Sequence, residues 1–146
     1  MPEDIPALQE FFGYALLPVT KAQKMLLLVG KGGEGKSRIG LVLRSLLGVN
    51  MNTGSLQKVE TDRFARADLE HELLMLDDDL KLEALPQTNN IKAIITAELP
   101  MDLEKKGQQS YQGDLYVRFI GLGNGTLQSL YDRSLGFFRR QIILSA

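Results

Sequence analysis

Residues 25–48 read MLLLVGKGGEGKSRIGLVLRSLLG, and this stretch decides the fold of the chain. Its apolar run Met25–Val29 is typical of a parallel strand that is buried on both faces. Residues 30–37 follow with the spacing G-x-x-x-x-G-K-S, the pattern of a phosphate-binding loop. Residues 37–47 then predict a helix, and Gly48 is a typical helix stop. The stretch therefore predicts a strand, a phosphate loop and a helix in succession.

The residue types of this loop suit a triphosphate. Glycines let the backbone wrap tightly and turn several N–H groups inward. Lys36 supplies a mobile positive charge for the β- and γ-phosphates of ATP, and the Ser37 hydroxyl is a ligand for Mg²⁺. A glycine-rich turn that matches the pattern by accident is the alternative. The predicted nucleotide-binding residues are Gly30, Lys31, Gly32, Gly33, Glu34, Gly35, Lys36 and Ser37.

The helix after the loop is predicted to bury an apolar face formed by Ile39, Val42, Leu43 and Leu46. This arrangement points its amino terminus at the phosphates, where the helix dipole favours an anion. A later helix, which would lead back to the next strand, is predicted to be capped by Thr61 or Asp62.

The chain has 146 residues, of which 44% are hydrophobic and 24% are charged, and this composition is typical of a single globular domain. It has 17 Lys and Arg against 18 Asp and Glu, and the net charge of −1 gives no global electrostatic case for nucleic-acid binding. Cysteine is absent and His71 is the single histidine, which excludes a disulfide framework and a cysteine- or histidine-rich metal site. No apolar run reaches the roughly 20 residues of a membrane span, so we expect no membrane contact and a cytoplasmic location.

A second apolar run, residues 73–76, ends in Asp77, Asp78 and Asp79. Placed after a phosphate loop, such a run predicts a Walker B strand that carries carboxylates to the edge of the sheet next to the loop. Asp77 is predicted to hold Mg²⁺ and Asp78 to accept a proton from the attacking water, with Asp79 in reserve if the register shifts by one. A strand entering a solvated turn is the alternative.

Residues 98–113 contain a charged stretch, Asp102-Leu103-Glu104-Lys105-Lys106. A hairpin with Lys105 and Lys106 at or near its tip is one interpretation, and a solvated charged loop is the other.

Two candidate groups lie in the last third of the chain. A strand predicted at residues 115–120 leads to Asn124, which would orient the attacking water, although a Gly-Asn-Gly run is also typical of a turn. Arg139 and Arg140 directly precede a strand predicted at residues 141–144. Arginine stabilises charge on a transferring phosphoryl group from a neighbouring subunit, whereas a surface ion pair is the alternative.

Together these motifs resemble the superfamily 3 helicase branch of AAA+ ATPases, as in phage, plasmid and poxvirus-type primase-helicases. Asp77 follows Lys36 by only 41 residues, which is similar to the compact spacing of that superfamily. The segments that carry the resemblance are FFGYALLP at 11–18, GKGGEGKS at 30–37, LLMLDDD at 73–79, IKAIITAE and DLEKK within 91–106, FIGLGN at 119–124 and DRSLGFFRR at 132–140.

The resemblance implies a three-layer α/β P-loop NTPase (AAA+) core with a mostly parallel sheet at residues 25–146, after a helical lead-in at residues 1–24. It implies Asn124 as a sensor, Lys105 or Lys106 as a DNA contact, and Arg139 or Arg140 as the inter-subunit finger. The partners it implies are ATP with Mg²⁺, single-stranded DNA inside a hexameric ring, and a primase region or other replication proteins.

Three features depart from the family pattern. Residues 96–98, Thr-Ala-Glu, stand where relatives often have a glycine-rich turn, and Gly125 and Thr126 follow Asn124 in place of a Glu-Leu-Pro type continuation. The chain stops at Ala146 whereas relatives continue, so we expect a truncated ATPase core.

Two other functions fit the same motifs. One is a monomeric P-loop phosphotransferase, in which Arg139 and Arg140 would be the cations of a lid. The other is a non-catalytic module in which nucleotide holds an assembly together.

Overall fold

The chain is described by a computed structural model, which places residues 2–18, 22–30, 35–81, 87–97, 99–123 and 139–145. The strands are β1 (Met25–Val29), β2 (Met51–Thr53), β3 (Leu74–Asp77), β4 (Met101–Leu103), β5 (Tyr111–Gly113), β6 (Arg118–Gly123) and β7 (Gln141–Ser145). The helices are α1 (Ile5–Ala15), α2 (Lys36–Leu47), α3 (Leu56–Thr61), α4 (Arg63–Ala67) and α5 (Asn89–Thr96), with 3-10 turns η1 (Pro2–Asp4) and η2 (Gly48–Asn50).

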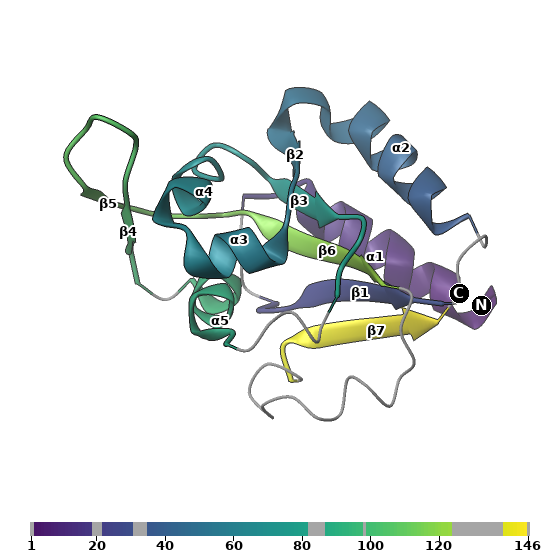
Figure 1. Cartoon of the computed structure of the whole chain (residues 1–146). Helices are drawn as coiled ribbons and strands as arrows, with labels where there is room; N and C mark the ends of the chain where they lie inside the picture. Colours follow the sequence, from purple (N-terminus) through teal and green to yellow (C-terminus); the bar gives the residue numbers. More distant parts are fainter. Residues whose placement is uncertain are drawn as a thin grey trace.

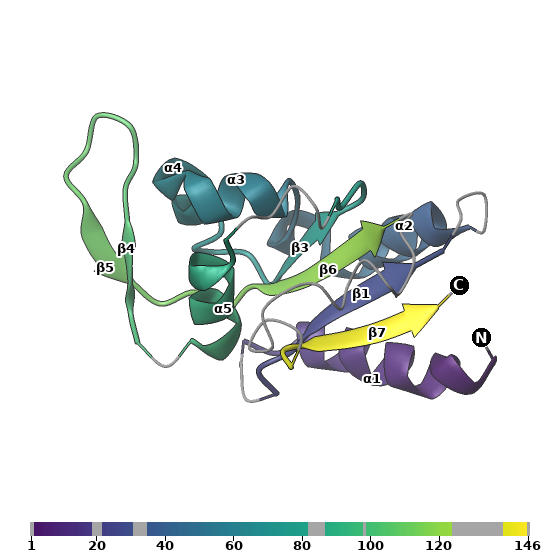
Figure 2. The ribbon, with the colours of Figure 1, turned by 60° about the horizontal axis from the view of Figure 1, so that its bottom comes forward.

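Five strands form one sheet in the order β2-β3-β6-β1-β7, and every neighbouring pair is parallel (Figure 1). Helices cover both faces, with α1 and α2 on one side and α3, α4 and α5 on the other (Figures 1 and 2). The predicted α/β fold with a mostly parallel central sheet is therefore confirmed. In the ranges that the structure describes, no helix is long and apolar enough to cross a membrane.

Side chains of the central strands alternate between two buried clusters, one on each face of the sheet. In β1, Leu27 and Val29 face the layer of α3, α4 and α5, while Leu26 and Leu28 face α1 and α2. This two-sided burial is why β1 is a continuous apolar run, and its predicted bounds are confirmed.

Helix α1 packs on the same core as the strands. Phe11 and Ala15 are buried against the α2 side of the sheet. Its carboxyl end is held by Arg118, the first residue of β6, which donates to the carbonyls of Tyr14, at 2.8 Å, and of Leu17. A buried cation thereby satisfies carbonyl groups that the end of a helix leaves without partners.

Helix α2 buries a different face from the predicted one. Its buried residues are Lys36, Gly40, Leu43 and Leu47. Val42 and Leu46 are 52% and 57% exposed, so their predicted burial is wrong. The reason is close packing at Gly40, where an added Cβ would lie 2.8 Å from Leu76 Cδ2, so that the helix lies on the sheet through its glycine.

Several element ends also differ from the prediction. The strand predicted at residues 115–120 begins at Arg118 and continues to Gly123. Helix α3 had no counterpart in the prediction and is capped by the Ser55 hydroxyl, which accepts from Lys58 N at 3.4 Å. The predicted cap at Asp62 is confirmed, since its carboxylate accepts from Phe64 N at 2.9 Å at the start of α4.

A separate antiparallel hairpin of β4 and β5 extends from the end of the sheet where β6 begins (Figure 2). Of the two interpretations of residues 98–113, the structure has the hairpin, with Lys105 and Lys106 exposed in its connecting loop. Leu103 in β4 is fully buried, and an added Cβ at Gly113 in β5 would lie 2.7 Å from Leu103 Cδ1. The base of the hairpin is thus anchored in the core while its tip is exposed.

Candidate functional site

At the carboxyl end of the sheet, the phosphate loop and the acidic turn both attach to strand β6. Strand β6 lies between β1, which leads into the phosphate loop, and β3, which leads into the acids. Gly30 N donates to Gly123 O at 3.2 Å, and Leu80 N donates to Leu122 O at 2.9 Å. The first residue of the loop and the turn after Asp77 are therefore fastened to the last two residues of β6.

A glycine makes room for this acidic turn. An added Cβ at Gly121 would lie 2.5 Å from Leu80 Cδ2, which is closer than a real Cβ approaches another atom. The Leu80 side chain therefore occupies the space above Gly121. The turn at residues 77–80 therefore packs closely against β6.

The described end of the phosphate loop joins directly to α2. Gly35 precedes the helix with φ of 80°, in the left-handed region that favours glycine. Lys36 follows as the first helical residue and is only 8% exposed, whereas Ser37 is exposed. The predicted ligands Lys31, Gly32, Gly33 and Glu34 lie outside the described residues.

Asp77 ends β3 as a buried carboxylate. Its Oδ2 accepts from Leu56 N at 2.9 Å, and its Oδ1 accepts from Asp79 N at 3.1 Å. Burial raises the pKa of Asp77, the two backbone hydrogen bonds oppose that rise, and the charges of Asp78 and Asp79 add to it. Asp78 and Asp79 are exposed in the turn that follows.

The carboxylates at this edge suit Mg²⁺ that arrives with a nucleotide better than a metal ion held by protein ligands alone. Mg²⁺ usually keeps several waters and takes one or two carboxylates together with phosphate oxygens. Each oxygen of Asp77 accepts one hydrogen bond and keeps a second lone pair, so the carboxylate can still bind a metal-held water. Within the described part of the chain, no group of three His, Cys, Asp or Glu residues could hold a metal by itself.

The paired arginines lie at the opposite end of the sheet. Arg140 O accepts from Met25 N at 2.7 Å, and Arg139 O accepts from Lys24 Nζ. A pocket of about 310 Å³ at this end is lined by Ala22, Gln23, Lys24, Arg139 and Arg140. The length of β1 separates this pocket from the phosphate loop by on the order of 13 Å, at about 3.3 Å per residue. One chain therefore does not bring the arginines to its own phosphate loop.

The hairpin of β4 and β5, whose connecting loop contains Lys105 and Lys106, lies at the amino end of the sheet (Figure 1). Lys105 Nζ lies 5.9 Å from the centre of the Tyr111 ring, a cation–π geometry. The Tyr111 hydroxyl donates to Glu70, and Arg63 Nε pairs with Glu104 Oε2 at 2.9 Å. These contacts hold the hairpin against the layer that contains α4.

Two buried charged residues were missed by sequence reasoning. Arg118 is 3% exposed, and its guanidinium lies 5.0 Å from the Tyr14 ring centre. The position of Arg118 inside an apolar run was the feature of the sequence that could have indicated its burial. Glu60 is 8% exposed and accepts from the backbone N–H groups of Asn90 and Ile91, and no pattern marks it in the sequence.

Solved structures with a similar fold include the NrS-1 C-terminal region and JCV helicase. The NrS-1 C-terminal region (305–718), in its apo form, superposes with a TM-score of 0.73 at 17% identity, over 99% of this chain and 35% of that one. The X-ray structure of JCV helicase gives a TM-score of 0.62 at 14% identity, over all of this chain and 41% of that one. The chain thus spans between a third and a half of the length of these structures. At such identities the likeness shows the fold alone.

The fold, together with the hydrogen bonds from Gly30 and Leu80 to the end of β6, defines the class of protein. It is a parallel α/β domain built on a strand, a glycine-rich loop and a helix. The chain belongs to the family described as "Family of unknown function (DUF5906)", whose model matches residues 28–140. A comparison with curated proteins finds no match. The matched residues contain every candidate described above, including Asn124, which follows Gly123 and lies outside the described residues.

Proposed function

We propose that this chain is the ATPase core of a DNA helicase that hydrolyses ATP at the interfaces between subunits. The observation that carries the proposal is the pair of hydrogen bonds from Gly30 and Leu80 to the end of β6. It gathers the phosphate loop, the acidic turn and the chain leading to Asn124 at one edge. Lys36 and Ser37 would bind phosphate and Mg²⁺ there, and Asn124 would sense the nucleotide.

Asp77 and Asp78 would divide the chemistry at this edge. The buried Asp77 would hold a metal-bound water, and the exposed Asp78 would accept the proton of the attacking water. When bound, Mg²⁺ supplies positive charge to the phosphate oxygens. Within the same chain, the other contacts would come from the loop, from α2 and from Asn124.

The arginines would act on the nucleotide of a neighbouring subunit. Arg139 and Arg140 lie at the amino end of the sheet, so a second copy is needed to bring them to a phosphate loop. This separation supports a closed ring, for which we propose a hexamer, over a monomeric phosphotransferase with a lid arginine. In the ring, Lys105 and Lys106 would contact single-stranded DNA from the exposed hairpin.

The test is the ATPase rate against protein concentration, with and without single-stranded DNA. We expect the specific rate to rise steeply with both, because each site needs a neighbour. A flat response at the level of uncatalysed hydrolysis, with DNA still bound, would favour a non-catalytic assembly module. Concentration-independent turnover with a small acceptor would favour the phosphotransferase.

Lys36→Ala tests the phosphate loop itself. Loss of a charged hydrogen-bond donor should weaken ATP binding by about tenfold or more. Lys58→Ala, an exposed lysine on α3, is the matched control and should leave affinity unchanged. Unchanged affinity in Lys36→Ala, measured by isothermal titration calorimetry, would sink the assignment.

A further inference from the structure

Helix α3 connects the acidic edge to a buried carboxylate. At its start, Leu56 N donates to Asp77 Oδ2 at 2.9 Å. Near its end stands Glu60, whose Oε2 accepts from Asn90 N at 2.8 Å and from Ile91 N at 3.1 Å. These two donors belong to the first turn of α5, so a short helix carries one hydrogen-bonded carboxylate contact at each end.

The contact between Glu60 and α5 is specific. In the described part of the chain, the carboxylate is held by backbone N–H groups and by no lysine or arginine. The amino-terminal helix dipole favours such a charge. The main-chain carbonyl of Glu60 also accepts from Asn90 Nδ2 at 2.9 Å and from Arg66 Nη1 at 3.1 Å. Glu60 therefore joins α3, α4 and the start of α5 at one point.

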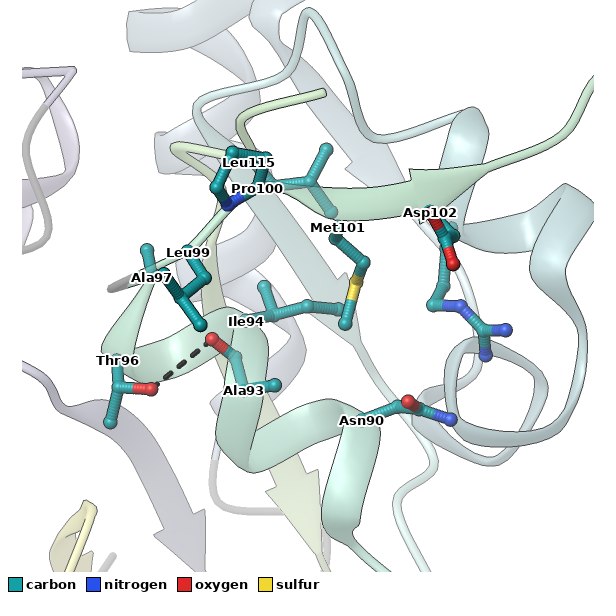
Figure 3. A pocket seen from close by; sticks show the side chains of 11 residues that line it. Asn90, Ala93, Ile94, Thr96, Ala97, Leu99, Pro100, Met101, Asp102 and Leu115 are labelled. Atoms are coloured by element: carbon teal, nitrogen blue, oxygen red, sulfur yellow. Dashed lines mark hydrogen bonds between the residues drawn. The ribbon is translucent and has the colours of Figure 1, made fainter. Parts of the chain in front are cut away.

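The other end of α5 leads into the hairpin. Ala97 ends the helix with φ of 48°, and the chain reaches β4 at Met101. A pocket of about 490 Å³ separates α5 from the start of β4, and Met101 and Ile94 reach toward each other across it (Figure 3). Beside this pocket, Met101 packs against the buried cluster that contains Ile94, so a shift of α5 reaches the base of the hairpin. Arg66 and Asn90, both bonded to Glu60, line the same pocket.

We propose that Glu60 is a positioning residue that couples the nucleotide site to the hairpin. Asp77 Oδ2 holds the first N–H of α3 in this structure, and the proposed function asks the same carboxylate to bind a metal-held water. A metal-held water would use the remaining lone pair of this carboxylate and weaken its hydrogen bond with Leu56 N, so nucleotide binding changes how firmly α3 is held. Glu60 passes the resulting shift of α3 to α5, and α5 passes it to the hairpin that carries Lys105 and Lys106. This inference rests on the proposed function.

The test compares Glu60→Gln with Glu70→Gln. Glu60→Gln keeps the size of the side chain and one acceptor oxygen but loses the charge at the start of α5. Glu70→Gln is the matched control because Glu70 contacts the hairpin through Tyr111 without touching α5. The readouts are single-stranded DNA affinity and backbone hydrogen exchange in residues 101–113, each with and without Mg²⁺ and a non-hydrolysable ATP analogue.

In the wild type and in Glu70→Gln, the analogue should change DNA affinity by about fivefold or more and alter exchange in the hairpin. In Glu60→Gln, ATP-analogue affinity should stay within about twofold of wild type, while the effect on DNA affinity falls below about twofold. Retention of the full effect in Glu60→Gln overturns the proposal. A wild type that binds no analogue overturns the proposed function instead.

One measurement needs no variant and guards against a Glu60→Gln chain that fails to fold. In the wild type, the analogue should alter exchange at the amides of Leu56, Asn90 and Ile91 together with the hairpin. Hairpin changes without changes at Asn90 and Ile91 would overturn the route through Glu60.

Discussion

At the carboxyl end of the central sheet, the candidate residues are built into buried strands and tight turns, whereas at the amino end they stand on an exposed hairpin and before an edge strand. Asp77 and Lys36 are 6% and 8% exposed. Lys105, Lys106 and Arg139 are all exposed. Under the proposed function, the carboxyl end forms its half of the site within one chain, while the cations of the amino end would act on groups outside that chain.

This difference explains why a single subunit holds only half of the proposed chemistry. In the proposed function, the carboxyl end would bind a phosphate through the loop and Lys36. The amino end has cations and lacks a phosphate loop of its own within reach. If the two ends are separate in this sense, substitutions at each end should have distinct effects.

The largest effect is expected for the arginines. Arg139→Ala or Arg140→Ala, whichever is the finger, should lower ATP turnover by about a thousandfold or more while ATP affinity stays unchanged. The reason is that the arginine acts on a neighbour's nucleotide. Steady-state ATPase assays and calorimetry measure the two quantities.

Mixing these variants with Lys36→Ala chains supplies the control. Mixed rings would contain some interfaces with an intact loop and an intact arginine, so partial turnover should return. Full turnover by a dilute arginine variant would mean that the two ends are not separate.

A second, smaller effect concerns the stability of the amino end. Arg118→Met should lower the free energy of unfolding by about 3 kcal/mol, because the carbonyls of Tyr14 and Leu17 lose the donor that a buried guanidinium supplies. For a chain of this size the melting temperature should fall by about 10 °C, measured by calorimetry. Arg63→Met is the control, since Arg63 is 65% exposed in its pair with Glu104 and should cost less than about 1 kcal/mol. Equal losses would contradict a structural role for Arg118.

A third effect should appear in the salt dependence of DNA binding. Removing Lys105 or Lys106 by alanine substitution should reduce the slope of log K against log salt by about 0.7 for each phosphate that is no longer neutralised. Lys81→Ala, an exposed lysine just after the acidic turn, should leave the slope unchanged. Fluorescence anisotropy with labelled single-stranded DNA at several salt concentrations measures it. The assignment of DNA to the amino end fails if Lys81→Ala has the larger effect.

The smallest effect is expected at the joint between α5 and the hairpin. Ala97 holds φ of 48°, where an L-residue is strained and glycine is not. Ala97→Gly should therefore stabilise the chain by about 1 kcal/mol in urea unfolding. Ala93→Gly, in the exposed middle of the same helix, should destabilise it by a similar amount, about 1 kcal/mol. Destabilisation by both changes would show that Ala97 is not strained.

The sequence predicted the elements that carry a strong local pattern. The apolar runs of β1 and β7, the stop at Gly48 and the cap at Asp62 are local features, and the structure has them. Ala97 lies in the segment where the resembled family often has a glycine-rich turn, and its φ of 48° is in the region that favours glycine.

Features that depend on packing could not be read from the sequence. Helix α2 has apolar residues on more than one face, so periodicity does not choose between Leu43, which is buried, and Leu46, which is not. Strand order is also non-local: β6 is late in the chain yet lies between β1 and β3. Glu60 has no neighbouring motif, because its partners Asn90 and Ile91 are brought to it by the tertiary fold.

The contact between Leu80 and Gly121 limits which pairs of residues members of this family can have at these two positions. With 2.5 Å between Leu80 Cδ2 and the place of a Cβ at position 121, any larger residue there requires a smaller one at position 80. We therefore expect these two positions to change together among homologues, or not at all. Paired substitutions at positions 80 and 121 would indicate that the acidic turn packs over β6 in the homologues as well.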